Sequence, residues 1–191
     1  MKKLLTFLIL LTAVGIAQNT NENTPDIKIS GFVKSDFFFD SRQVATFREG
    51  HFLLYPLNEL LDENGEDINA KASFNALSIQ SRVTAKLFGP EVLGAKSGGL
   101  IEGEFFGTSD SDVNGFRLRH AYVTLNWENT GLLFGQTWHP MFVTDVFPQV
   151  VSFNTGSPFQ PFSRNPQIRL TQSFDKFNLI AALLTQRDVT S

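Results

Sequence analysis

The sequence predicts an all-β protein, a transmembrane antiparallel β-barrel of which about seven strands are readable in 191 residues. Apolar and polar residues alternate along segments of about 9–11 residues, which suffice to cross a bilayer at a tilt. The polar positions carry full charges, and short and long connections alternate along the chain. A small packed core could not hold those charges unpaired, whereas a water-filled lumen can. We therefore favour the membrane barrel over a soluble β-sandwich or lipocalin-like barrel, which also has alternating strands.

The N-terminus predicts export. Residues 1–17 are assigned as a signal peptide, because two lysines precede an apolar run, residues 4–16, that is too short to span a membrane as a helix. Residues 18–26 form a polar flexible lead-in, and residues 27–191 form the barrel domain. The chain has no cysteine, which excludes disulfides and thiolate chemistry, and its net charge of −3 argues against nucleic acid as a partner.

The first two strands show the clearest pattern. Residues 27–40, IKISGFVKSDFFFD, and residues 77–88, LSIQSRVTAKLF, place mostly apolar residues at odd positions and polar residues at even ones. A cation on the lipid face at the bilayer midplane costs roughly 2–4 kcal/mol, so Arg82 and Lys86 are expected to face the lumen. The positions of the second strand expected to face lipid are Leu77, Ile79, Val83 and Leu87.

Five further strands are predicted, the first from the same alternation and the other four from weaker alternation: 100–107, 116–127, 132–138, 167–174 and 177–186. The second of these does not fit one phase, because Ala121 and Val123 suit the lipid face while Arg117 and Arg119 share their parity. Either a β-bulge near His120 switches the face, or the arginines lie beyond the hydrocarbon.

The connections predict the orientation. Short ones (GPEVLGAKSG, ENTG and DK) alternate with a polar loop, TSDSDVNG, and with two long loops near 41–71 and 139–166. Outer-membrane barrels have short periplasmic turns and longer external loops, which places the N-terminus in the periplasm. Aromatic residues near strand ends suit the two membrane interfaces: Phe88, Trp127, Trp138, Phe174 and Phe177. Because bacterial single-chain barrels use even strand numbers, the seven strands predict the N-terminal part of a larger barrel, incomplete at its C-terminus.

Several motifs occur in an order found in one group of porins. REGHFLLYP, DENGEDINA, SFNALSIQSR, FRLRHAYV, GQTWHPMF and SFNTGSPFQPFSRNPQIRLTQSF together resemble the DcaP-like outer-membrane porin family over most of residues 27–175. The resemblance implies a homotrimer of roughly 16-stranded barrels in contact with outer-membrane lipid of a Gram-negative bacterium, each with a long loop folded into its lumen. It also implies passive diffusion of small hydrophilic, often anionic, solutes. The chain departs from the family in stopping near the middle of such a barrel, and its short N-terminus has no room for the coiled-coil extension of some members.

The charged positions of the predicted inner face are candidates for a selectivity filter, since charges in a pore bias which ion enters. The alternative is that they pair across strands and only keep the lumen polar. The candidates are Lys34, Asp36, Arg82, Lys86, Glu102, Glu104, Arg117, Arg119 and Arg169. In both interpretations the group predicts a water-filled lumen.

The stretch GQTWHPMF, residues 135–142, is expected to begin the constriction. Pro140 has no backbone donor and ends the strand, so we interpret His139 as a polar residue at the rim of a pore loop and not as a catalyst. The candidates for the constriction loop are Trp138, His139, Pro140, Phe142, Asp145 and Phe147.

Other chemistry has little support in the sequence. DENGEDIN offers oxygen ligands for calcium, but an Asn-Gly turn explains the segment without a metal. The ligands would be Asp62, Asn64, Asp67 and Asn69. The sequence has no G-x-S-x-G, no H-E-x-x-H and no glycine-rich phosphate loop, and the histidines are not spaced as a metal site: His51, His120 and His139.

We therefore expect an outer-membrane porin without cofactor, metal or enzymatic activity. Two rival functions stay open. The first is a binding or adhesion barrel that uses the loops near 41–71 and 139–166, and the second is an outer-membrane hydrolase with a Ser–His pair.

Overall fold

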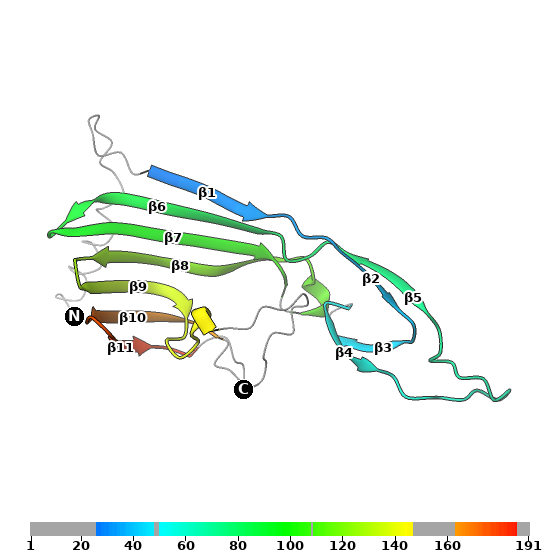
Figure 1. The fold of residues 1–191 in the computed structure, drawn as a ribbon. Helices are drawn as coiled ribbons and strands as arrows, with labels where there is room; N and C mark the ends of the chain where they lie inside the picture. The colour runs from blue at the N-terminus through cyan, green and yellow to red at the C-terminus, as the bar shows by residue number, and fades with distance from the viewer. Residues whose placement is uncertain (1–25, 48–49, 108, 147–162, 187–191) are drawn as a thin grey trace, which may run out of the picture.

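Seven strands form one antiparallel sheet in the computed structural model, which describes residues 26–47, 50–107, 109–146 and 163–186 (Figure 1). In order along the sheet they are β1 (Asp26–Phe32), β6 (Arg82–Val92), β7 (Ala95–Phe105), β8 (Phe116–Asn126), β9 (Thr130–Trp138), β10 (Arg164–Ser173) and β11 (Asn178–Leu184). The all-β antiparallel fold is confirmed, and every predicted strand contributes to this sheet. The predicted signal peptide, 1–17, and residues 18–25 of the lead-in lie outside the described residues.

The short turns all lie at one end of the sheet, and the long connections leave from the other (Figure 1). The turn between β6 and β7 consists of Leu93 and Gly94, whose positive φ angles of 52° and 73° suit a two-residue hairpin. The indole of Trp127 donates to the carbonyl of Leu93 at 3.0 Å. This tight turn corrects the predicted connection GPEVLGAKSG, because both strands continue through most of that segment.

The first long connection, between β1 and β6, contains structure that the sequence did not predict. β2 (Asp36–Asp40) pairs with β5 (Ser73–Leu77), and β3 (Val44–Phe47) pairs with β4 (Phe52–Pro56). The β2–β5 ribbon extends past the end of the main sheet, and the β3–β4 hairpin turns back towards it (Figure 1). The segment 41–71, predicted as one long loop, therefore holds a complete hairpin.

Two predicted strands are each divided in two. The segment 27–40 breaks after β1, where the amide of Lys34 donates to Ser81 Oγ at 3.0 Å and leaves the ladder. The segment 77–88 breaks between β5 and β6, where Gln80 has a positive φ of 67°. This irregular backbone changes the phase of the side chains, so Ile79, which was expected to face lipid, is buried with 5% of its surface exposed.

A bulge in β8 decides the orientation of its arginines. Glu102 of β7 lies opposite His120, but the next pair joins Gly103 to Leu118, so β8 carries one extra residue, Arg119. Arg119 and His120 are both buried, while Leu118 is 50% exposed. Of the two alternatives for this strand, the bulge is therefore the observed one.

The two faces of the sheet differ in chemistry. One face exposes large apolar side chains, among them Ile29, Val83, Ile101, Leu118, Val123, Phe134 and Ile168. The buried residues of the described part are instead largely polar or charged, and its buried apolar residues are only Ile79, Ala95, Phe106 and Phe142. Apolar outside and polar inside is the arrangement of a barrel strand that contacts lipid on one face. No described helix combines the length and apolarity needed to cross a bilayer.

Candidate functional site

Glu104 of β7 is the centre of a cluster of charged side chains. The glutamate is fully buried, and its carboxylate accepts hydrogen bonds from Arg82 at 2.8 Å, Arg117 at 2.9 Å and Arg119 at 2.8 Å. Arg164 of β10 approaches the same carboxylate at 4.0 Å. Arg82 and Arg117 lie directly opposite Glu104 on the two neighbouring strands. Strand alternation and register thus place one carboxylate between cations from both sides.

Glu102 extends the cluster along β7. It accepts hydrogen bonds from Arg119 Nε at 2.7 Å and from Thr84 Oγ1 at 2.8 Å, and Arg82 Nε lies at 3.6 Å. His120 Nε2 lies 3.8 Å from the same carboxylate. We call the following residues the charge cluster: Arg82, Glu102, Glu104, Arg117, Arg119, His120 and Arg164. Its arginines outnumber its glutamates, so its formal charge is positive.

Trp138 packs against this cluster. Its ring lies 5.5 Å from the guanidinium of Arg119 and 5.2 Å from that of Arg164, distances typical of cation–π contacts. The His120 ring lies edge-on at 5.3 Å. The expected position of Trp138 at the outer membrane interface is therefore wrong. Gly135, three residues earlier in β9, has a positive φ of 129°, and a Cβ there would clash with the carbonyl of Ala121.

The other predicted filter residues lie outside the charge cluster. Lys34 and Asp36 form an ion pair with each other where the chain leaves β1. Lys86 lies opposite Lys28 and Leu100, and no ion pair among the described residues includes it. No ion pair among the described residues joins Lys34, Asp36 or Lys86 to the charge cluster.

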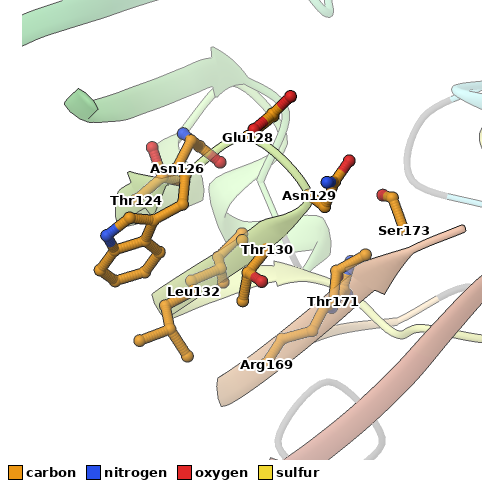
Figure 2. A pocket seen from close by; sticks show the side chains of 12 residues that line it. Thr124, Asn126, Glu128, Asn129, Thr130, Leu132, Arg169, Thr171 and Ser173 are labelled. Atoms are coloured by element: carbon orange, nitrogen blue, oxygen red, sulfur yellow. The ribbon is translucent and has the colours of Figure 1, made fainter. Parts of the chain in front are cut away.

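Arg169 of β10 is held by neutral oxygens. Its guanidinium donates to the carbonyl of Trp138 at 2.6 Å and to Gln167 Oε1 at 2.9 Å. It also lines a polar pocket of about 380 Å³ at the short-turn end of β8, β9 and β10 (Figure 2). Thr124 and Thr171 line the same pocket, so Arg169 supplies a second cationic position away from the charge cluster.

The predicted constriction loop is only partly described. Phe142 is buried against Trp138, with ring centroids 4.6 Å apart, and its amide donates to the carbonyl of His139 at 2.9 Å. Pro140 follows the end of β9 and is partly buried, while Asp145 is exposed in a short 3₁₀ turn. Phe147 lies outside the described residues.

Sequence reasoning missed Arg164 and the buried residues beside it. Arg164 and Asn165 are buried at the start of β10, inside the segment 139–166 that was predicted as a loop, and the buried Gln167 is the first residue of the predicted strand 167–174. Pro166 argued against a strand here, because proline has no backbone N–H to donate to a neighbouring strand. The alternation of Asn165, Gln167 and Arg169 was the available signal, since these polar residues continue the period of β10.

His120 lies between a carboxylate and a hydroxyl, the order of groups in a nucleophilic triad. Its Nδ1 is 3.0 Å from Thr137 Oγ1, opposite the side that faces Glu102. However, the same Glu102 oxygen is bound more closely by Arg119, and Thr137 is buried. This arrangement gives a substrate little access and does not favour the hydrolase.

The carboxylates proposed for calcium bind their own turn instead. Asp62 accepts the amides of Asn64 at 2.8 Å and Glu66 at 2.9 Å, and the Glu66 amide holds the pKa of Asp62 below its ordinary value. Asp67 accepts the amide of Leu60 at 3.0 Å, which likewise lowers the pKa of Asp67. Within the described ranges, no three His, Cys, Asp or Glu side chains are placed to hold a metal ion.

Comparison with known proteins gives two matches. A family model described as DcaP outer membrane protein matches residues 12–190. Among solved structures, the chain is similar to the outer membrane channel DcaP of Acinetobacter baumannii, with a TM-score of 0.60 and 24% sequence identity. The alignment covers 87% of this chain and 43% of that channel, so the chain spans less than half of the channel's length. No curated protein matches the chain.

Proposed function

The chain belongs to the DcaP outer membrane protein family, whose members lie in the outer membrane of Gram-negative bacteria, and we propose that it forms part of the wall of a diffusion channel for small hydrophilic solutes. One observation carries this proposal. The sheet exposes apolar side chains on one face and holds the charge cluster on the other, with Glu104 bound by arginines of β6 and β8. A protein with a dry interior would not bury this many charges, whereas a wet lumen solvates their outer ends.

The same cluster supports a preference for anions. Glu104 and Glu102 are engaged by arginines, so the excess positive charge lies on guanidinium groups. Arg82 and Arg117 keep 22% of their side-chain surface exposed, so their guanidinium groups remain accessible to a solute in the lumen. Fixed cations on a pore wall raise the local concentration of anions and bias entry towards them.

The described residues that follow β9, in the connection between β9 and β10, support a narrowing of the lumen at the level of the charge cluster. Phe142 packs on Trp138, which in turn contacts Arg119 and Arg164. The proposed constriction loop therefore starts at the charge cluster. The homotrimer implied by the sequence resemblance stays a prediction, which the native mass of the detergent-solubilised protein would test.

Reconstitution of the complete gene product into planar bilayers tests the proposal. We expect stepwise conductance and, under a salt gradient, a reversal potential that indicates anion preference. A folded protein that never conducts would overturn the channel and favour the adhesion barrel. Conductance with a preference for cations would leave the channel intact and overturn only the proposed role of the excess arginines. Ester hydrolysis that is lost in a His120→Ala variant would support the hydrolase.

A further inference from the structure

The hairpin β3–β4 has its tip packed against the main sheet. His51, just before β4, and Phe52, its first residue, contact the ring of Phe106, with centroids 5.5 and 5.7 Å apart. Phe106 follows the last residue of β7 and is 1% exposed, and His51 is 8% exposed. The hairpin therefore lies against the end of β7 through His51 and Phe52. It is thus a docked element and not a free external loop.

Phe106 connects this hairpin to the charge cluster. The guanidinium of Arg117 lies 4.8 Å from the centre of the Phe106 ring, and the same guanidinium donates to Glu104 Oε1 at 2.9 Å. The neighbouring Phe105 points to the apolar face instead. It is 46% exposed, and its ring centroid lies 5.0 Å from that of Phe116. The hairpin therefore docks on the charged side of the sheet, beside the arginines.

The base of the hairpin is also fixed. The amide of Leu57 donates to the carbonyl of Gln43 at 2.8 Å, which closes the two strands. Arg42, just before β3, binds Asp67 Oδ2 at 2.6 Å and donates to the carbonyl of Leu57. An element held at both its base and its Phe106 contact keeps one position relative to the charge cluster.

We propose that the β3–β4 hairpin is a constriction element of the channel and that Phe106 positions it, together with Arg117, at the charge cluster. This inference rests on the proposed function. It adds the first long connection to a constriction that the sequence assigned to residues 139–166. An anion passing the cluster meets Arg117 and the hairpin beside it, so the position of the hairpin sets both the width and the selectivity of that passage.

Thiol modification tests the position of the hairpin, because the chain has no cysteine of its own. Thr46→Cys and Leu54→Cys introduce single thiols at exposed sites on its two strands. Modification by a sulfonate-bearing or an ammonium-bearing methanethiosulfonate should lower the conductance at one site or both. The two reagents should shift the reversal potential in opposite directions. Glu63→Cys, at the exposed turn of the same connection, is the control and should not respond.

Each outcome of this experiment has one interpretation. Unchanged conductance at both hairpin sites, with full modification verified by mass spectrometry, would overturn the constriction role while leaving the channel intact. An unmodified protein without conductance would instead overturn the proposed function.

Substitution of the aromatic ring tests the positioning role. Phe106→Leu should raise the conductance and change the reversal potential, because the hairpin loses its contact and Arg117 loses its ring. Phe106→Tyr keeps the ring and should retain both values. Phe105→Leu, on the opposite face, is the matched control. The positioning role of Phe106 would be contradicted if Phe105→Leu changed the conductance and reversal potential as much as Phe106→Leu does. It would also be contradicted if Phe106→Tyr changed them as much as Phe106→Leu.

Discussion

Glu104 in the main sheet and Asp62 in the first connection are both carboxylates with several partners, but they are stabilised differently. Glu104 is fully buried, and its arginines come from β6 and β8, up to 22 residues away in the sequence. Asp62 is exposed, and its donors lie two and four residues further along the chain. The buried carboxylate compensates charges that the fold brings together, whereas the exposed one satisfies backbone amides of its own turn. Loss of the Glu104 carboxylate should therefore lower the stability of the whole sheet, whereas loss of the Asp62 carboxylate should affect only its own turn.

The largest effect is expected for Glu104→Gln. Removing one partner of a buried ion pair leaves its cations uncompensated, which costs about 3–5 kcal/mol. The free energy of unfolding, measured by urea titration in lipid vesicles, should fall by about that amount. Glu63→Gln in the exposed turn is the control. A loss below about 1 kcal/mol, the range of an exposed ion pair, would show that Glu104 behaves like a surface group.

The next largest effect is expected on ion selectivity, when one charge in the cluster is reversed. Arg82→Glu places a third carboxylate beside Glu102 and Glu104 and should move the reversal potential towards cation preference. Lys176→Glu makes the same charge change at the exposed turn between β10 and β11. Unchanged reversal potentials for Arg82→Glu would reject a filter role for this arginine.

A smaller and local effect is expected for Arg42→Gln. The substitution removes the ion pair with Asp67 and the hydrogen bond to the carbonyl of Leu57, which together fix the base of the β3–β4 hairpin. Amide hydrogen exchange of Leu57 should accelerate, while exchange in β7 and β8 should not change. If exchange in the main sheet accelerates equally, then the hairpin and the sheet unfold as one unit. Lys71→Gln, nearby and exposed, serves as the control.

The smallest effect concerns pH. The pKa of Asp62 is below its ordinary value of 3.8, because the Glu66 amide stabilises the charged form. Its contribution to the turn is thus present above the ordinary value and is lost as the pH falls through the lowered one. Exchange of the Glu66 amide, followed in acid, should accelerate there, and Asp62→Asn should remove that pH dependence. A transition that persists in Asp62→Asn would assign it to another group, with Asp67 the first to test.

The sequence predicted the strands of the main sheet well and their details less well. Alternation located all seven strands and the charged side of β6 and β7, but it left two alternatives open for β8. It could not find the break at Gln80, which depends on an unusual backbone angle, or the packing of Trp138 on the charge cluster, which depends on Arg119 and Arg164 of the neighbouring strands. Arg164 was missed for a related reason, since Pro166 made the start of β10 resemble a loop.

The candidate site shows the same division. Arg82, Glu102, Glu104, Arg117 and Arg119 were all identified from the sequence as filter candidates, and the structure brings them into contact. Lys34, Asp36, Lys86 and Arg169 were identified by the same reasoning and lie elsewhere. Parity indicates the face of a strand but not the height on that face, and ion pairs require both.

By itself, the sequence determined that this chain forms antiparallel strands with one apolar face and one charged face, because side-chain alternation is a local property of an extended backbone. Only the tertiary structure decided which charges meet. The bulge at Arg119 turns both Arg119 and His120 to one side, and the hairpin tip packs on Phe106. These outcomes depend on register with a neighbouring strand and on contacts between distant segments, which no local pattern encodes.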